Sequence, residues 1–148
     1  MIGWAIDEHL RTDLVEAALS MAVAMRGEVA QEVILHADYA GSHYTAIHYS
    51  ETLILDGLIP SIGTVGDALD NALCETTIGL YKTECVREGS PFRTGPIRTL
   101  TDLENSTSAW VAWYNERRLM HRLKRRPPAE AEAEYYARLH AGKHTGHT

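Results

Sequence analysis

Apolar residues recur at helical spacing near the start of the chain, three or four positions apart between residues 14 and 25. The pattern predicts a helix with Thr12 as its N-cap, Asp13 in its first turn and Gly27 as its stop. Its methionines are typical of side chains that fill gaps in a core. The apolar positions of this helix are Leu14, Ala17, Ala18, Met21 and Met25.

Two short apolar segments further along are typical of strands. Residues 33–35 are continuous, apolar and mostly β-branched, which favours a buried strand. Residues 58–62 predict a second strand, in which Pro60 favours an edge position. Between them, apolar positions over residues 44–54 predict a helix that ends at Gly57. This alternation of strands and helices predicts an α/β fold.

The remaining chain predicts helices joined by loops. Residues 63–67 are loop-like, and a helix that carries Glu75 begins at Asp70 or Asn71. Asn71 and Glu75 are four positions apart and share a face of that helix. Glycines and prolines over residues 87–98 predict a linker.

A capping-box pattern, Thr101-x-x-Glu104, predicts the start of the next helix. Its aromatic cluster, around Trp110 and Trp113, favours helix packing over base stacking. A basic pair and two prolines over residues 125–128 predict a break and a basic corner, and residues 129–139 have helical propensity. The polar end of the chain, with three histidines over residues 140–147, predicts disorder rather than a metal site.

Composition predicts one ordinary globular domain, with 148 residues, 45% apolar and 23% charged. No apolar run is long enough for a membrane span, and no secretory signal follows Met1. Cys74 and Cys85 are typical of reduced thiols. We therefore expect a cytoplasmic protein. The net charge of −6 disfavours DNA binding, but it is unevenly distributed. Residues 93–127 hold eight arginines and lysines against three acids, and local basic surface is what contacts phosphate.

Two carboxylates are candidates for metal chemistry. Asp38 directly follows the first predicted strand and Glu75 lies on a predicted helix. Carboxylates are the ligands that Mg²⁺ and Mn²⁺ prefer, and such ions can drive displacement at phosphorus. The pair alone is more typical of solvated surface groups than of a metal site.

The strings around these acids resemble bacterial insertion-sequence transposases of the DDE group, which have a retroviral-integrase-like catalytic core. Residues 36–46 (H-A-D-Y-A-G-S-H-Y-T-A) are similar to the family's H-S-D-x-G-S-Q-Y-T-S, and residues 57–67 to its G-I-x-x-S-x-S-x-x-G-x. Residues 70–75 (D-N-A-L-C-E) are similar to D-N-A-x-x-E. Residues 113–119 and 127–130 resemble W-Y-N-x-x-R-L and x-P-A-E.

The resemblance implies that Asp38 and Glu75 are the second and third acids of the family's catalytic triad and bind Mg²⁺ or Mn²⁺, two ions in the family. Residues 1–4 are similar to a string that follows the first acid, so that acid is expected to be absent. Asp67 or Asp70 could replace it, although loop or cap roles fit them better. There are 36 residues between Asp38 and Glu75, one more than the family's thirty-five.

The implied fold is ribonuclease-H-like, a mixed sheet flanked by helices that lacks its first strands. We expect a partial catalytic core over residues 1–86, a linker with a basic helical part over 87–136, and a disordered tail over 137–148. Loss of the first strands predicts exposed apolar surface and pairing with another chain. The implied function is DNA integration, with transposon ends and target DNA as partners, no membrane, and association with the nucleoid.

Several residues are candidates for contact with DNA or for support of the site, each with a plainer alternative. His36 either supports Asp38 or is structural, and Asn71 supports Glu75. The basic candidates either bind phosphate or are solvated: Lys82, Arg117, Arg118, Arg125 and Arg126. Alternatives for the whole chain are a non-catalytic DNA-binding or regulatory remnant that pairs with itself or with a full-length transposase, and a nuclease on the same fold.

Overall fold

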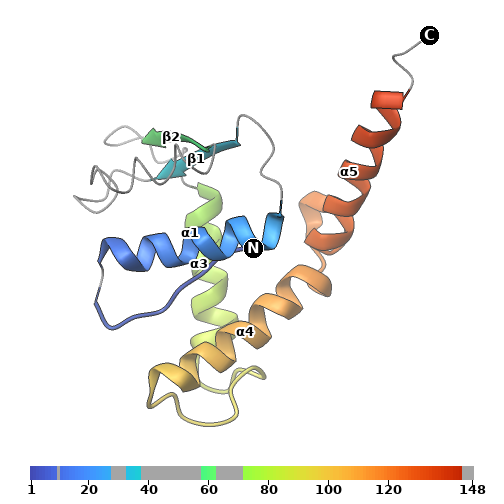
Figure 1. Cartoon of the computed structure of the whole chain (residues 1–148). Helices are drawn as coiled ribbons and strands as arrows, with labels where there is room; N and C mark the ends of the chain where they lie inside the picture. Colours follow the sequence, from blue (N-terminus) through green and yellow to red (C-terminus); the bar gives the residue numbers. More distant parts are fainter. Residues whose placement is uncertain (10, 28–32, 38–57, 63–71, 145–148) are drawn as a thin grey trace. The chain divides into compact units, whose positions relative to one another are not determined.

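The computed structural model describes residues 1–9, 11–27, 33–37, 58–62 and 72–144 (Figure 1). They divide into two compact units, Ile2–Thr83 and Glu84–Thr148, the second of which also includes Met1. Helices with a small sheet give an α/β fold, as predicted. Within the described ranges, no helix is long and apolar enough to cross a membrane.

Helix α1 (Thr12–Arg26) confirms the first predicted helix. Its N-cap is Arg11, whose backbone is extended (φ −132°, ψ 164°), so the prediction of Thr12 as the cap is wrong. Thr12 already lies within the helix, whereas a cap residue needs a non-helical backbone. Gly27 ends the helix as predicted, with φ 74° and its N–H donating to the Val23 carbonyl at 3.1 Å.

The segment before α1 packs closely on this helix at Gly3. A Cβ atom at Gly3 would lie 2.2 Å from the carbonyl oxygen of Ala18 and 2.7 Å from the Cβ of Ala22. Any larger residue would therefore push the segment away from the helix.

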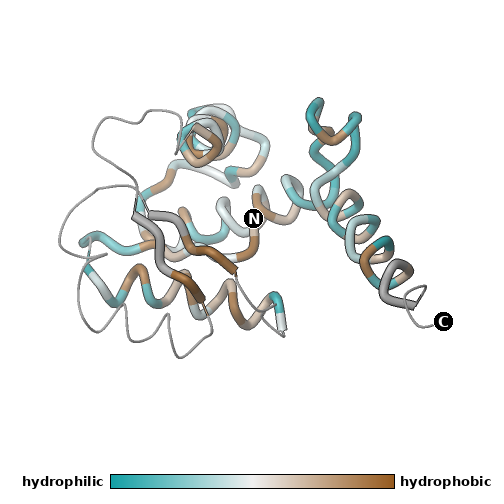
Figure 2. The backbone as a smooth tube through the Cα atoms, turned by 90° about the horizontal axis from the view of Figure 1, so that it is seen from above, coloured by the Kyte–Doolittle hydropathy of each residue, from teal (hydrophilic) through white to brown (hydrophobic). Residues whose placement is uncertain are grey.

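Strands β1 (Val33–Ala37) and β2 (Leu58–Ile62) form a two-stranded parallel sheet. Both strands were predicted, β2 with its exact bounds, and Figure 2 shows hydrophobic residues on each. Leu58 and Leu19 of α1 are buried together, with Val15, Val23 and Leu35 packed against them.

The other face of the sheet is open among the described residues. Ile34 and Ile59 are partners in the register, and their exposed fractions are 64% and 47%. Val33 is also 40% exposed, so the prediction that the first strand is buried is wrong for two of its residues. Successive side chains of a strand point to opposite faces, so Ile34 and Ile59 point away from the face on which Leu35 and Leu58 pack against α1.

Helix α3 (Ala72–Leu80) carries Glu75, as predicted, and continues into a π-helix, η1 (Tyr81–Val86). None of the side chains of α3 is buried, and Leu73 and Ile78 are 69% and 51% exposed. Threonine hydroxyls of α3 bond to carbonyls one turn earlier, as in Thr76 to Ala72 at 2.7 Å.

In the second unit, residues 87–99 form turns and loop, as predicted, and lead into helix α4 (Leu100–Glu116). The capping box that starts α4 is formed by Thr99 and Asp102. The predicted box at Thr101 and Glu104 is wrong, because Thr101 already lies inside the helix. The buried residues of α4 include Trp110, with no exposed surface, and Tyr114, which confirms that the aromatic cluster serves packing.

Helix α4 ends at Glu116, well before the break predicted at residues 125–128. A 3₁₀ turn, η2 (His121–Leu123), follows, and α5 (Pro128–His144) begins with a proline in its first turn. Helix α5 therefore includes residues 137–144, which the sequence analysis assigned to the tail.

Candidate functional site

Glu75 lies in the first turn of α3 with its side chain exposed. A carboxylate there is favoured by the positive end of the helix dipole. Asp38 and Asn71, its predicted partners in the site, lie outside the described residues. His36 lies in β1 opposite Ser61 of β2. The structure therefore places one predicted acid on an accessible helix start and leaves its partners undescribed.

Among the described residues, no three histidines, cysteines, aspartates or glutamates lie close enough together to bind a metal ion. Glu75 has the donor chemistry that Mg²⁺ and Mn²⁺ prefer, but it supplies a single carboxylate. The donor type fits a divalent ion, and the set of ligands needs residues beyond those described.

The predicted phosphate-binding residues fall into two groups. Lys82 in η1, Arg117 at the end of α4, and Arg125 all have exposed side chains. Arg118 and Arg126 are instead bound by acids of their own unit. The exposed members remain accessible for a phosphate.

Arg118 binds Glu84 with one edge of its guanidinium group, formed by Nε and Nη2. Its Nη2 lies 2.7 Å from Oε1 of Glu84, and its Nε lies 3.2 Å and 3.1 Å from Oε1 and Oε2. The indole N–H of Trp110 donates to the same carboxylate at 3.2 Å. The guanidinium carbon also lies 5.8 Å from the ring centre of Tyr114, within cation–π range.

These contacts shift the ionisation of both partners. The hydrogen bond from Arg118, followed by that from Trp110, lowers the pKa of Glu84, although partial burial opposes the shift. The hydrogen bond to Glu84 raises the pKa of Arg118. Sequence reasoning missed Glu84, because 34 positions separate it from Arg118 and no local pattern links them.

Arg126 is bound by Glu134 of α5, which also accepts a hydrogen bond from Arg138. The Nε of Arg126 donates to the Leu123 carbonyl at 3.2 Å. Glu134 and Arg138 were not predicted as site residues, although their spacing of four on a helix is a recognisable ion-pair signal.

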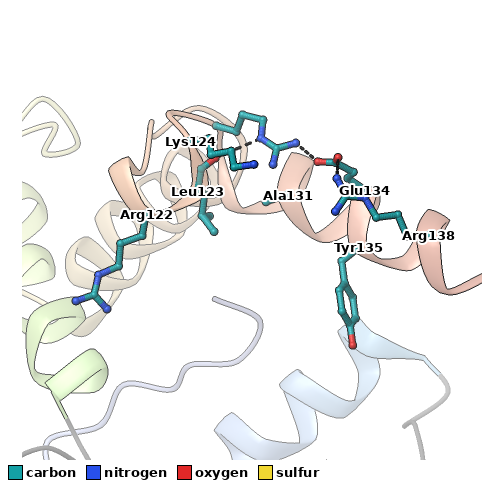
Figure 3. A pocket seen from close by; sticks show the side chains of 8 residues that line it. Arg122, Leu123, Lys124, Ala131, Glu134, Tyr135 and Arg138 are labelled. Carbon is teal, nitrogen blue, oxygen red and sulfur yellow. Dashed lines mark hydrogen bonds and ion pairs between the residues drawn. The ribbon is translucent and has the colours of Figure 1, made fainter.

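Beside these residues, the chain between α4 and α5 and the first turns of α5 line an open hollow of about 310 Å³ (Figure 3). Its basic lining residues are Arg122, Lys124, Arg126 and Arg138, and its other lining residues include Leu123, Ala131 and Tyr135. Arg122, Lys124 and Arg126 belong to the basic stretch over residues 93–127, but no hollow was predicted there.

Comparison with known proteins gives a family match over residues 56–128, to the integrase core domain. The chain is 41% identical over 141 residues to a putative transposase for insertion sequence element IS986/IS6110 of Mycobacterium tuberculosis, covering 93% of this chain and 49% of that protein. It is 37% identical to the transposase for insertion sequence element IS629 of Shigella sonnei, covering 94% of this chain and 44% of that protein.

A shorter relative, an uncharacterized protein of Mycobacterium tuberculosis, is 72% identical over 58 residues, which cover 39% of this chain and 75% of that protein. The chain thus spans about half the length of the curated transposases it matches. Glu75 and all five predicted basic residues lie within the matched integrase core segment, and Asp38 precedes it.

Proposed function

Because this chain belongs to the insertion-sequence transposases of the DDE group, the family with an integrase core domain, we propose that it forms part of a core that joins DNA strands. The identity to named transposases over nearly the whole chain is the observation that carries this proposal. The proposed fold is the ribonuclease-H-like one, of which β1, β2, α1 and α3 form a part.

In this proposal Asp38 and Glu75 are ligands of Mg²⁺ or Mn²⁺, with His36 and Asn71 as supporting residues. The bound ions would supply activation of the attacking hydroxyl and stabilisation of the leaving oxygen. The accessible position of Glu75 at the start of α3 supports its part, because its side chain is exposed and, within the described ranges, no arginine or lysine forms an ion pair with it.

Backbone phosphates of DNA are the proposed partners of the exposed basic residues. Lys82, Arg117 and Arg125 keep their charges in solvent, where phosphate contact needs charge rather than base recognition. Arg118 and Arg126 are less suited to that role, because Glu84 and Glu134 already bind their guanidinium groups. Contacts of this kind would keep the protein on nucleoid DNA.

A strand-transfer assay tests the catalytic part of the proposal. The purified chain is incubated with Mn²⁺, a duplex that carries the end of its own insertion sequence, and a supercoiled plasmid target. Joined products that disappear in Glu75→Gln would show that this chain completes a working site without the first acid of the family's triad, whereas no joining by the folded protein would favour the non-catalytic module described below. Glu104→Gln is the matched control, because Glu104 is an exposed glutamate on α4. Joining that persists in Glu75→Gln would refute the role of this acid.

The second candidate is a non-catalytic module that pairs with a full-length transposase. The exposed isoleucine pair on the sheet, Ile34 and Ile59, favours it, because a strand face with this much apolar surface is typical of an interface. Co-purification with a tagged full-length transposase tests it. We expect Ile34→Lys to abolish capture, whereas Met25→Lys, at an apolar position of α1 that is 67% exposed, leaves capture intact.

A further inference from the structure

The hollow beside α5 is framed by a turn whose backbone is fixed by hydrogen bonds. The N–H of Met120 donates to the Arg126 carbonyl at 3.2 Å, and the N–H of Arg125 donates to the Met120 carbonyl at 3.0 Å. Lys124 and Arg125 both have left-handed backbones, with φ of 56° and 58°. Two successive left-handed residues other than glycine are uncommon and store strain, which is frequent at binding sites.

The rim of the hollow is strongly basic. Four of its lining residues are arginine or lysine and one is acidic, which leaves an excess of three positive charges. Glu134 forms ion pairs with both Arg126 and Arg138. Because Glu134 takes up these two groups, Arg122 and Lys124 are the basic lining residues that can bind the oxygens of a phosphate group.

The rest of the lining is apolar and aromatic. Leu123 and Ala131 contribute apolar surface, and Tyr135 is 59% exposed. In Figure 3 the ring of Tyr135 extends away from α5, on another side from the carboxylate of Glu134. Unpaired bases stack on exposed aromatic rings, while basic side chains of the same site hold their phosphates.

We propose that this hollow binds one nucleotide of single-stranded DNA, with its phosphate on the basic rim and its base on Tyr135. The inference rests on the proposed function of the chain in handling DNA. A base inside a duplex is stacked and paired, and a hollow of about 310 Å³ admits one such unit, so the ligand is an unpaired strand or strand end.

The test measures fluorescence anisotropy of the full chain with labelled oligo(dT) and with a fully paired duplex, over a range of salt concentrations. Tyr135→Ala is expected to weaken oligo(dT) binding about fivefold or more and to leave duplex binding within about twofold. Tyr135→Phe keeps the ring and is expected to bind as the wild type does.

The charged rim is tested by Arg122→Gln. It is expected to weaken oligo(dT) binding and to reduce the slope of log affinity against log salt by about 0.7. Arg87→Gln is the matched control, because it removes the same charge from an exposed residue outside the hollow. Circular dichroism and thermal unfolding check that each variant is folded.

The nucleotide site would be overturned if Tyr135→Ala left the oligo(dT) affinity unchanged, or if it weakened oligo(dT) and duplex binding equally. In either case, duplex binding by the wild type would still uphold the proposed function. Arg122→Gln that behaves like Arg87→Gln would overturn the phosphate part. A folded wild type that binds neither DNA would overturn both proposals.

Discussion

Arg118 and Glu84 form a bidentate ion pair, with 2.7 Å between Nη2 and Oε1, although they are 34 positions apart in the chain. The pair connects η1 to the residues that follow α4. Its side chains are only 20% and 26% exposed, and Trp110, which is fully buried, donates to the same carboxylate. A largely enclosed pair of this kind costs more to break than an exposed one.

Replacing Arg118 by methionine is expected to lower the free energy of unfolding by about 1–3 kcal/mol, because Glu84 loses its partner in a largely enclosed place. Arg117→Met, at the exposed neighbouring arginine, should change it by less than about 0.5 kcal/mol. Urea unfolding followed by tryptophan fluorescence measures both. Equal losses in the two variants would show that the pair contributes nothing specific.

The lowered pKa of Glu84 makes this contribution depend on pH. It is fully present above the ordinary pKa of 4.5 and is lost as pH falls through the lower pKa of the folded protein, because the carboxylate is then protonated. The stability difference between wild type and Glu84→Gln should therefore shrink in acid. Hydrogen bonds from Arg98 and Thr99 also lower the pKa of Asp102. The free energy of unfolding of both proteins should therefore still fall somewhat in acid. A difference that stays constant down to pH 2 would contradict this account.

The start of α4 allows a direct test of the observed cap. The hydroxyl of Thr99 accepts from the N–H of Asp102 at 3.1 Å, and Asp102 accepts from the N–H of Thr99 at 2.9 Å. Thr99→Ala should cost about 1 kcal/mol, whereas Thr101→Ala, at the exposed position that the sequence favoured, should cost less than about 0.5 kcal/mol. Melting temperatures rank the two variants, and the reverse order would place the cap at Thr101.

The backbone at Lys124 predicts an unusual order of substitutions. With φ 56° and ψ 43°, the residue pays about 1 kcal/mol for its left-handed conformation, which glycine adopts freely. Lys124→Gly should leave stability unchanged or slightly higher, and Lys124→Val should lower it by about 1–2 kcal/mol. Denaturant midpoints distinguish them, and a glycine variant that is the less stable would refute the assignment.

The two thiols should differ in reactivity. Cys74 is exposed on α3, whereas Cys85 has no exposed surface and burial raises the pKa of its thiol. A thiol reagent such as Ellman's is therefore expected to modify one cysteine in the native protein and two in urea. In Cys74→Ser the native signal should vanish. Rapid native modification of that variant would mean that the packing around Cys85 opens readily.

Local chemistry was enough to predict several elements. Gly57 and Gly63 flank residues 58–62 in the sequence and mark both ends of β2. In α1, apolar residues recur at helical spacing and Gly27 marks the end of the helix. The cap of α4 was misplaced because Thr99-x-x-Asp102 and Thr101-x-x-Glu104 have equivalent spacing. Only the backbone conformation, extended at Thr99, distinguishes them.

The candidate site was predictable only in part. The placement of Glu75 on a helix follows from its neighbours in sequence, and the structure agrees. Whether a basic side chain is accessible depends on acids from other elements, as Arg118 and Arg126 show with Glu84 and Glu134. The hollow likewise depends on how residues 122–126 and α5 meet, which no periodicity encodes.

The π-helical stretch Tyr81–Val86 affects how the length of this chain can vary. A π turn arises when a helix accommodates an additional residue without changing the packing on either side of it. Shortening the chain by one residue there, for example at the exposed Thr83, would let the helix revert to regular α geometry while Glu84 and Cys85 keep their orientation. We therefore expect a one-residue deletion at this turn to cost little stability, whereas the same deletion in α4 would rotate Trp110 out of its core.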